Sequence, residues 1–149
     1  MEVLAKGGRK RRTRDREGLV LDLPAKPESL RVARQAVAAL GARLGLPGAR
    51  IDDLRTLVTE ACANAVTHAY DGGEGSIRLR VIPRGDELTI VVADDGVGIK
   101  PRPASEKSSG RLGLLLMAAL SSKVEIAQRP GGGTRVKVRF PLSNGAPLA

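Results

Sequence analysis

The feature that most constrains the fold is a pair of hairpin patterns in the second half of the chain. Residues 76–82 alternate apolar and charged side chains, and the apolar residues 88–93 follow after a short turn that contains Pro and Gly. A short strand pattern at 124–127 and an alternating one at 134–140 flank a turn with one Pro and three Gly. Period-two alternation indicates half-buried strands, and strands joined by short turns pair antiparallel. The sheet is therefore expected to be mainly antiparallel.

Helical patterns fill most of the remaining chain. Apolar residues recur three and four positions apart from Pro27 to Leu44, and again from about Ile51 to Tyr70, which places them on one helical face. Residues 112–120 are almost continuously apolar and predict a third helix. The segment 100–110 is rich in Pro and Ser and has no apolar period, so it is expected to be a mobile loop.

A short strand at residues 19–23 completes the order strand, helix, helix, strand, strand, helix, strand, strand. This order predicts an α+β two-layer sandwich, with a mixed, mostly antiparallel sheet and three helices on one face. A doubly wound parallel sheet would need strands and helices to alternate throughout. We expect residues 1–18 to form a basic, disordered arm, residues 19–141 the folded domain, and residues 142–149 a flexible tail.

Composition excludes several classes of protein. The chain has no Trp, one Tyr and one Phe, so it lacks the aromatic platform on which single-stranded nucleic acids stack. The single cysteine, Cys62, excludes an internal disulfide and a cysteine-based zinc site, and it is expected to be a small core residue. No apolar run approaches the roughly 20 residues of a membrane span. A cytoplasmic protein without membrane contact is expected.

Positive charge is concentrated at the start of the chain. The formal net charge is +9, and residues 1–18 hold seven basic and three acidic side chains. This arm could simply be solvated, or it could contact nucleic acid or an acidic partner. Three arginines on the outer face of the first predicted helix, Arg31, Arg34 and Arg43, allow the same two interpretations, a solvated surface or a partner surface.

Two polar residues stand out in the second predicted helix. Glu60 and Asn64 are four residues apart, so they share one face of an otherwise apolar helix. A carboxylate beside an amide oxygen suits a hard cation such as Mg²⁺, or a hydroxyl group that is to be activated. Polar residues at this spacing also occur on ordinary solvated faces, and the spacing alone leaves both interpretations open.

Two glycine-bearing segments follow. Asp94-x-Gly96-x-Gly98 comes directly after an apolar strand, where a carboxylate can accept a hydrogen bond from an amino group and glycines allow close backbone approach. It could equally be an ordinary strand-end turn. Residues 109–114, with Gly110 and Gly113, are expected to open a helix, where free N–H groups favour phosphate, although an ordinary helix start would have the same pattern. Neither segment fits a calcium loop, a dinucleotide fingerprint or a Walker A loop.

In combination and in this order, these segments resemble the GHKL, or Bergerat-fold, ATP-binding superfamily over about residues 19–141. The sequence has counterparts of five features of this superfamily. These are the E-x-x-x-N pattern of its N box, its D-x-G-x-G box, its lid loop, its second glycine box and a threonine late in the domain. Within this superfamily, residues 60–70 are similar to the anti-sigma-factor serine kinases of the RsbW/SpoIIAB type. The residues that carry the resemblance are Glu60, Asn64, Asp94, Gly96, Gly98, Gly113 and Thr134.

The resemblance implies a role for each position. Asp94 would hold the adenine amino group, with Gly96, Gly98 and Thr134 nearby, and Asn64 would coordinate Mg²⁺. Glu60 would be the general base that orients a serine hydroxyl for attack on the γ-phosphate. The backbone of residues 110–113 would wrap the phosphates, and either Lys107 or Arg111 would neutralise γ-phosphate charge. Arg111 stands where such kinases usually have glycine, and it cannot adopt a positive φ cheaply.

The function implied is that of an ATP-binding anti-sigma factor and serine kinase. Such a protein sequesters a sigma factor and phosphorylates a serine on an anti-anti-sigma (STAS) protein, and it is a homodimer. The cofactors implied are ATP and Mg²⁺. The altered glycine box leaves one alternative, an ATP-binding regulatory switch without kinase turnover.

Overall fold

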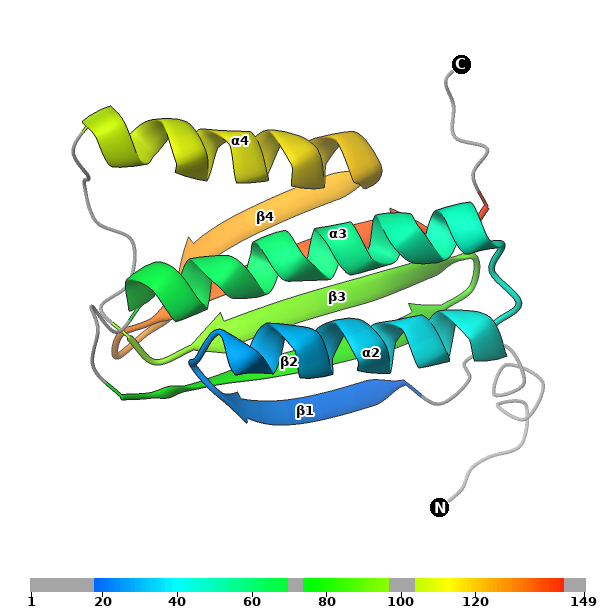
Figure 1. The fold of residues 1–149 in the computed structure, drawn as a ribbon, viewed down its shortest axis with the longest axis horizontal. Helices are drawn as coiled ribbons and strands as arrows, with labels where there is room; N and C mark the ends of the chain where they lie inside the picture. Colours follow the sequence, from blue (N-terminus) through cyan, green and yellow to red (C-terminus); the bar gives the residue numbers. More distant parts are fainter. Residues whose placement is uncertain (1–17, 70–73, 97–103, 144–149) are drawn as a thin grey trace.

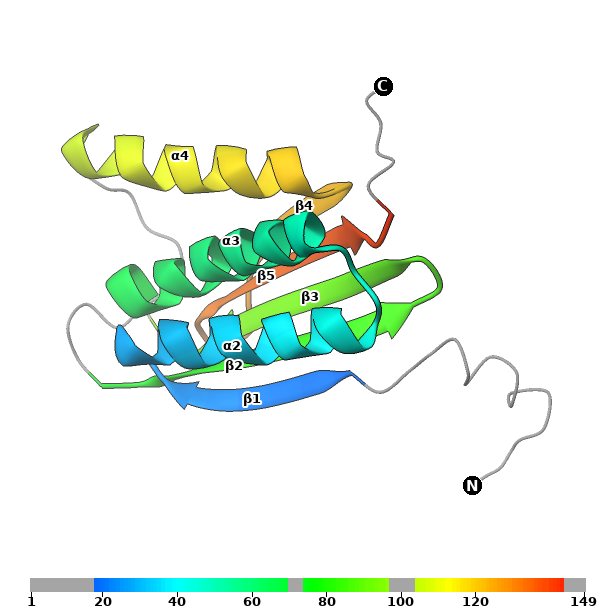
Figure 2. The same ribbon diagram turned by 45° about the vertical axis from the view of Figure 1, so that its right-hand side comes forward.

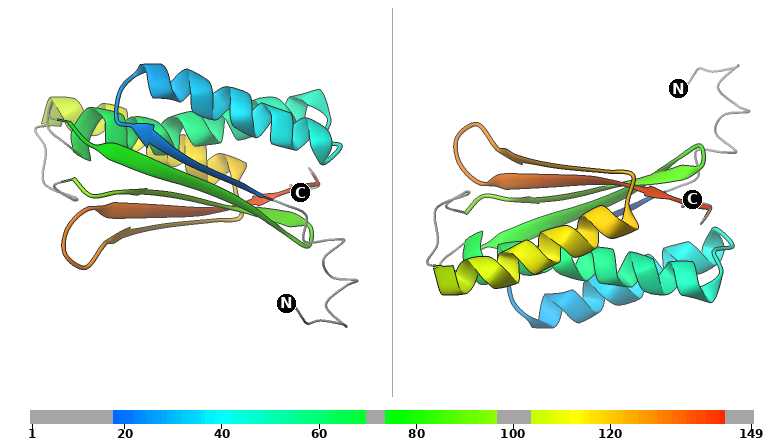
Figure 3. Two further views of the ribbon diagram at one scale, coloured as in Figure 1. Left: turned by 90° about the horizontal axis from the view of Figure 1, so that it is seen from below. Right: turned by 90° about the horizontal axis from the view of Figure 1, so that it is seen from above.

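In the residues that the structure describes, a five-stranded sheet carries three helices on one of its faces, as Figures 1 and 3 show from three directions. The computed structural model describes residues 18–69, 74–96 and 104–143. The strands follow the spatial order β1-β2-β3-β5-β4. They are β1 (Leu19–Pro24), β2 (Ser76–Arg84), β3 (Glu87–Asp94), β4 (Lys123–Gln128) and β5 (Thr134–Pro141). The predicted two-layer α+β sandwich is confirmed.

Every neighbouring pair of strands in the described chain is antiparallel, so the sheet is antiparallel throughout rather than mixed. A helical crossover leads from β3 to β4, and such a crossover normally returns the next strand parallel to the first. Here β5 folds back from β4 and pairs with β3, so that the two parallel strands are never neighbours. Strand β3, the more apolar strand of its hairpin with β2, occupies the centre of the sheet, as predicted.

The helices lie side by side across the sheet (Figure 2). They are α2 (Glu28–Arg43), α3 (Gly48–Asn64) and α4 (Ala104–Leu120), and a π-helical turn, η1 (Ala65–Ala69), continues α3. Helix α2 covers the β1 side, α3 covers the middle and α4 covers the β4 side (Figure 1). None of the helices in the described ranges is long and apolar enough to cross a membrane.

Helix α4 corrects the prediction of a mobile loop over residues 100–110. The helix begins at Ala104, so the loop prediction is wrong for residues 104–110, while residues 97–103 lie outside the described chain. The segment contains Ala, Glu and Lys, which have high helix propensity, and it continues into the packed part of α4. An apolar period is therefore not required for these residues to be helical.

The core lies between the sheet and the helices and is almost entirely aliphatic. Val136, Val138 and Phe140 point inward from β5 as the alternation predicts, and Cys62 is fully buried. Burial raises the pKa of the Cys62 thiol to about 12, because the surrounding apolar side chains disfavour the thiolate. Other large buried side chains are Leu40, Leu54, Leu57, Ile77, Leu79, Leu88, Ile90 and Met117.

Candidate functional site

Four segments that are distant in the sequence lie at the same end of the molecule. The end of α3, the end of β3, the start of α4 and the turn between β4 and β5 all lie at the left of Figure 1, and Figure 2 shows the same grouping. Each of these segments carries residues predicted to form a site: Glu60 and Asn64 on α3, Asp94 on β3, Lys107 in the first turn of α4 and Thr134 at the start of β5. The topology therefore brings the separate motifs to one end.

Asp94 is a buried carboxylate at the last position of β3, with 6% of its surface exposed. Its Oδ1 accepts a hydrogen bond from the N–H of Gly96 at 2.9 Å and one from the N–H of Thr134 at 3.3 Å. No ion pair joins this carboxylate to a cation within the described ranges. Asp94 thus forms the predicted strand-end turn, and it is also a desolvated acceptor held by backbone donors.

The turn between β4 and β5 fixes the backbone of Asp94 in a way that the motif analysis missed. Gly133 has a φ of +95°, and a Cβ atom on it would collide with the carbonyl oxygen of Asp94. Nη1 of Arg129 donates to that oxygen at 2.9 Å and pairs with Oδ1 of Asp95 at 2.6 Å. The run of three glycines at 131–133 was the only sequence signal for this close approach.

Glu60 lies against α4 rather than on a fully solvated face. A Cβ atom on Gly113 would lie 2.7 Å from Oε1 of Glu60, so the absence of a side chain at Gly113 makes room for the carboxylate. Glu60 and Asn64 are both half-buried and are one helical turn apart. Glu60 also borders a surface hollow formed with Arg34 of α2 and with Asp52, Arg55, Thr56 and Thr59 of α3.

The second glycine segment does not open a helix, which corrects the prediction for residues 109–114. Gly110 and Gly113 lie inside α4, whose first residue is Ala104. Interior N–H groups of an α-helix bond to carbonyls four residues back, so these groups are not free to wrap phosphates in this conformation. The free N–H groups belong to the first turn of α4, near Ala104. Arg111 is helical and needs no positive φ, so its substitution for glycine is not strained here.

Several predicted residues cannot be placed further. Gly98 lies outside the described residues, and of Lys107 and Arg111 only the helical backbone is described, so the choice between these two cations stays open. The π-helical turn after Asn64 had no signal in the sequence pattern. Such wide turns are rare and are frequently found at functional sites, which agrees with the position of Asn64 at this end of the molecule.

Comparison with known proteins decides the family. The family described as "Histidine kinase-like ATPase domain" matches residues 23–140. The serine-protein kinase RsbW of Bacillus pumilus is 34% identical over 127 residues, which cover 74% of this chain and 78% of that protein. The chain belongs to the histidine kinase-like ATPase family, among its RsbW-type members.

Other relatives agree with this assignment to the RsbW type. RsbW of Bacillus subtilis strain 168 is 33% identical over 127 residues, again 74% of this chain and 78% of that protein. The anti-sigma F factor of Clostridium beijerinckii is 30% identical over 131 residues, which cover 80% of this chain and 90% of that protein. The resemblance stated from the motifs is confirmed, and with it a serine kinase of an ATP-using family.

A solved structure supports the fold independently. The RsbU and RsbW domains of a Mycobacterium tuberculosis protein superpose with a TM-score of 0.68 at 25% sequence identity. The match covers 90% of this chain, and this chain spans about a third (35%) of that longer one. The RsbW-type fold therefore extends over nearly all of the present chain.

Proposed function

We propose that this RsbW-type chain is an anti-sigma factor and serine kinase that uses Mg²⁺ and ATP. In this proposal it sequesters a sigma factor and phosphorylates a serine of an anti-anti-sigma (STAS) protein. The observation that carries the proposal is the placement of Glu60 against Gly113, one helical turn from Asn64, at the same end of the molecule as buried Asp94. A carboxylate, an amide oxygen and a desolvated acceptor are the groups that this chemistry needs.

The residues at this end have the chemistry to hold the nucleotide. Asp94 would accept a hydrogen bond from the adenine amino group, because its carboxylate is buried and is held by the N–H groups of Gly96 and Thr134. The side-chain oxygen of Asn64 would bind Mg²⁺, which prefers oxygen ligands. Bound Mg·ATP supplies the transferable γ-phosphoryl group. The free N–H groups at the start of α4 would favour its negative charge.

Glu60 would act as the general base. Glu60 is half-buried and lines a hollow that is open to solvent, from which a serine hydroxyl of a partner would approach it. By accepting the hydroxyl proton, Glu60 would orient the oxygen for in-line attack, and positioning of this kind supplies much of the rate in phosphoryl transfer. Gly113 lets the carboxylate keep that position, because any larger residue would push it away.

The protein partners belong to the proposal as well. The cations Arg31, Arg34 and Arg43 are exposed on α2, where they form a candidate partner surface. A homodimer is part of the same proposal, and a sigma-factor partner would place the chain in the bacterial cytoplasm. Residues 1–17 of the basic arm (residues 1–18) lie outside the described residues, and the choice between a solvated arm and a nucleic-acid contact stays open.

The experiment separates nucleotide binding from phosphate transfer. Full-length wild type and Glu60→Ala are incubated with Mg²⁺, labelled ATP and a STAS protein, and label on the STAS serine is counted. We expect Glu60→Ala to lose at least about 100-fold in transfer rate, in the range for a general base. Mg·ATP at 100 times Kd should still stabilise both proteins by about 2.7 kcal/mol. Glu28→Ala, at the exposed first turn of α2, is the matched control and should transfer normally.

Two results would contradict the proposal. Equal transfer by wild type and Glu60→Ala would show that Glu60 is not the base. If the nucleotide stabilises the wild type but no phosphate is transferred, the regulatory switch is favoured instead. If the nucleotide does not stabilise the wild type, both the kinase and the ATP-binding switch are excluded.

A further inference from the structure

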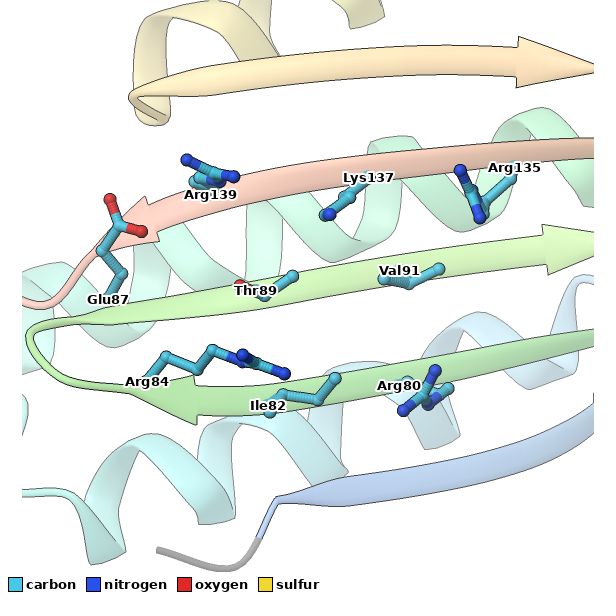
Figure 4. A pocket seen from close by; sticks show the side chains of 9 residues that line it. All are labelled: Arg80, Ile82, Arg84, Glu87, Thr89, Val91, Arg135, Lys137 and Arg139. Carbon is cyan, nitrogen blue, oxygen red and sulfur yellow. The ribbon is translucent and has the colours of Figure 1, made fainter. Parts of the chain in front are cut away.

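The face of the sheet turned away from the helices forms a shallow trough with cations on both sides (Figure 4). Strand β3 is its floor, where Thr89 and Val91 are half-buried. Because alternate residues of a strand point to the same face, the two neighbouring strands each contribute a row of basic side chains. The rows are Arg80 and Arg84 on β2, and Arg135, Lys137 and Arg139 on β5.

These five cations outnumber the acidic side chains beside them in the part of the chain that the structure describes, which are Glu87 opposite Arg84 and Glu125 opposite Lys137. None of them forms an ion pair with a described acidic residue. Glu87 is the acidic residue among those that line the trough, and it lies at one end of it, beside Arg139 in Figure 4. Glu125, on the neighbouring strand β4, pairs with Lys123 at 3.1 Å. The trough is therefore a site of positive potential.

The positive charges of the β5 row act on Glu125, which lies opposite Lys137 in the register of β4 and β5. Its pKa is lowered mainly by the hydrogen bond from Lys123 and by the charge of Lys123, and further by the charges of Lys137 and Arg139. A second pair on the same face joins Arg78, two residues before Arg80 on β2, to Asp22 of β1 at 2.7 Å. The ion-paired cations thus lie next to the trough, while the five that line it form no ion pair in the described chain.

The spacing of the two rows suits a regular polyanion. The rows lie on strands separated by β3, so they are about 10 Å apart, twice the usual strand spacing. Within the β5 row, alternate residues are about 7 Å apart. A repeating chain of negative charges that runs along β3 would be contacted from both sides.

We propose that this face binds the phosphate backbone of duplex DNA without reading its sequence. Protein–DNA interfaces are more polar and much more positive than protein–protein interfaces, and four of the five cations are arginine, whose planar guanidinium matches phosphate oxygens. Nothing in this inference depends on the proposed kinase activity. It places a nucleic-acid contact on the folded domain, whereas the sequence left such a contact open for the basic arm beside a simply solvated arm.

Other occupants fit the face less well. A protein partner would need an apolar or aromatic core in its interface, but Ile82 and Val91 are the apolar residues among those lining the trough, and both are half-buried. A second copy of the chain would bring the same positive surface against itself. Single strands bind by stacking on aromatic side chains, and none lines the trough.

The test is the salt dependence of DNA binding by the full chain. Fluorescence anisotropy of a labelled 20-base-pair duplex of arbitrary sequence is measured between 50 and 200 mM KCl. Each phosphate contact contributes about −0.9 to the slope of log K against log salt. Five contacts therefore weaken binding about 500-fold over this range. Arg135→Gln/Lys137→Gln/Arg139→Gln should make the slope shallower by about 2.7.

Two further variants make the result specific. Arg80→Gln/Arg84→Gln removes the other row and should make the slope shallower by about 1.8, even if the first variant folds poorly. Lys26→Gln/Arg31→Gln/Arg43→Gln removes the same number of charges as the β5 variant, but from exposed positions on the helix side of the molecule. It should change the slope of log K against log salt by less than about 0.9, the contribution of one phosphate contact. Circular dichroism confirms that each variant is folded.

Three outcomes would overturn the proposal. The first is an unchanged slope in both row variants, which would assign DNA binding to another part of the chain. The second is an equal effect of the helix-side variant, which would reduce the effect to net charge. The third is no binding of the duplex at 50 mM KCl together with binding of poly-L-glutamate that the row variants abolish, which would make the partner an acidic protein.

Discussion

Replacing Gly113 by alanine tests whether the position of Glu60 matters for catalysis. Gly113 is inside α4 and is not among the described glycines with positive φ, so alanine fits the backbone. The new Cβ would lie 2.7 Å from Oε1 of Glu60. The carboxylate is the free end of a flexible side chain, so it can move without disturbing the core. Stability and activity should therefore respond in opposite directions.

The two magnitudes follow from the local geometry. Alanine in a helix interior is favoured over glycine by about 0.5–1 kcal/mol, which would raise the melting temperature by a few degrees (~2–8 °C per kcal/mol). The distance from the new Cβ to Oε1 of Glu60 must increase from 2.7 Å to at least 3.4 Å, the start of ordinary van der Waals contact. The carboxylate oxygen must therefore move by at least 0.7 Å. A misplacement of about 1 Å can cost about 100-fold in rate, so we expect the rate of phosphate transfer by Gly113→Ala to fall about 10- to 100-fold.

The assay is phosphate transfer to a STAS protein at saturating ATP, together with thermal unfolding of each variant. Gly48→Ala is the matched control, because a Cβ there meets nothing within 4 Å, and it should keep full activity. In a Glu60→Ala background the carboxylate is absent, so Gly113→Ala should not reduce the residual rate further. This double-mutant cycle isolates the contact between the two residues.

One result would refute this account of Gly113: full transfer activity in a stably folded Gly113→Ala protein. It would mean that the carboxylate tolerates displacement from its place beside α4, and that Glu60 is not a positioned base. A loss of rate that persists in the Glu60→Ala background would also contradict it, because the effect would then arise from another property of α4.

Three further predictions concern the scaffold. Gly133→Ala should lower the free energy of unfolding in urea by at least about 2 kcal/mol. The alanine would have to adopt a φ of +95°, and its Cβ would collide with the carbonyl oxygen of Asp94. A decrease below 0.5 kcal/mol would show that the turn can move. Arg50→Ala should lower the free energy of unfolding by about 2–4 kcal/mol in the same assay. Arg50 is buried, its guanidinium lies 4.0 Å from the Phe140 ring centroid, and it donates a hydrogen bond to a backbone carbonyl. A decrease below 1 kcal/mol would contradict this. Burial raises the pKa of the Cys62 thiol to about 12, while its pKa in the unfolded chain stays near 9. The folded protein should therefore resist thiol reagents at pH 8, and rapid labelling would refute the burial of Cys62. The stability that the buried, protonated thiol contributes should be complete below pH 9 and should be lost as the pH rises toward 12.

The parts of the fold that local patterns determine were predictable from the sequence. Alternation in β5 specifies which side chains face the helices, and Val136, Val138 and Phe140 are buried as expected. The four-residue spacing of Glu60 and Asn64 fixes their common helical face wherever the helix packs. These predictions succeed because period and burial are coupled directly within one element.

The parts that depend on contacts between distant elements were not predictable. In the sheet, β5 lies between β3 and β4. Either strand of the β4–β5 hairpin could pair with β3, and a local pattern does not encode that choice. The contact of Gly113 with Glu60 arises from packing of α4 on α3, so the glycine could only be interpreted as part of a phosphate loop. Similarly, the need for glycine at Gly133 becomes visible only when the Asp94 carbonyl lies beside it.

Strand β5 links the two sites while keeping them on opposite faces of the sheet. The N–H of Thr134 holds the Asp94 carboxylate at the end of the molecule where the kinase motifs meet. The next residue, Arg135, begins the row of cations on the open face. Because alternate side chains of a strand point in opposite directions, substitutions in the basic row leave the helix-facing side of β5 unchanged. A defect in DNA binding and a defect in phosphate transfer can therefore be assigned to separate faces of the same strand.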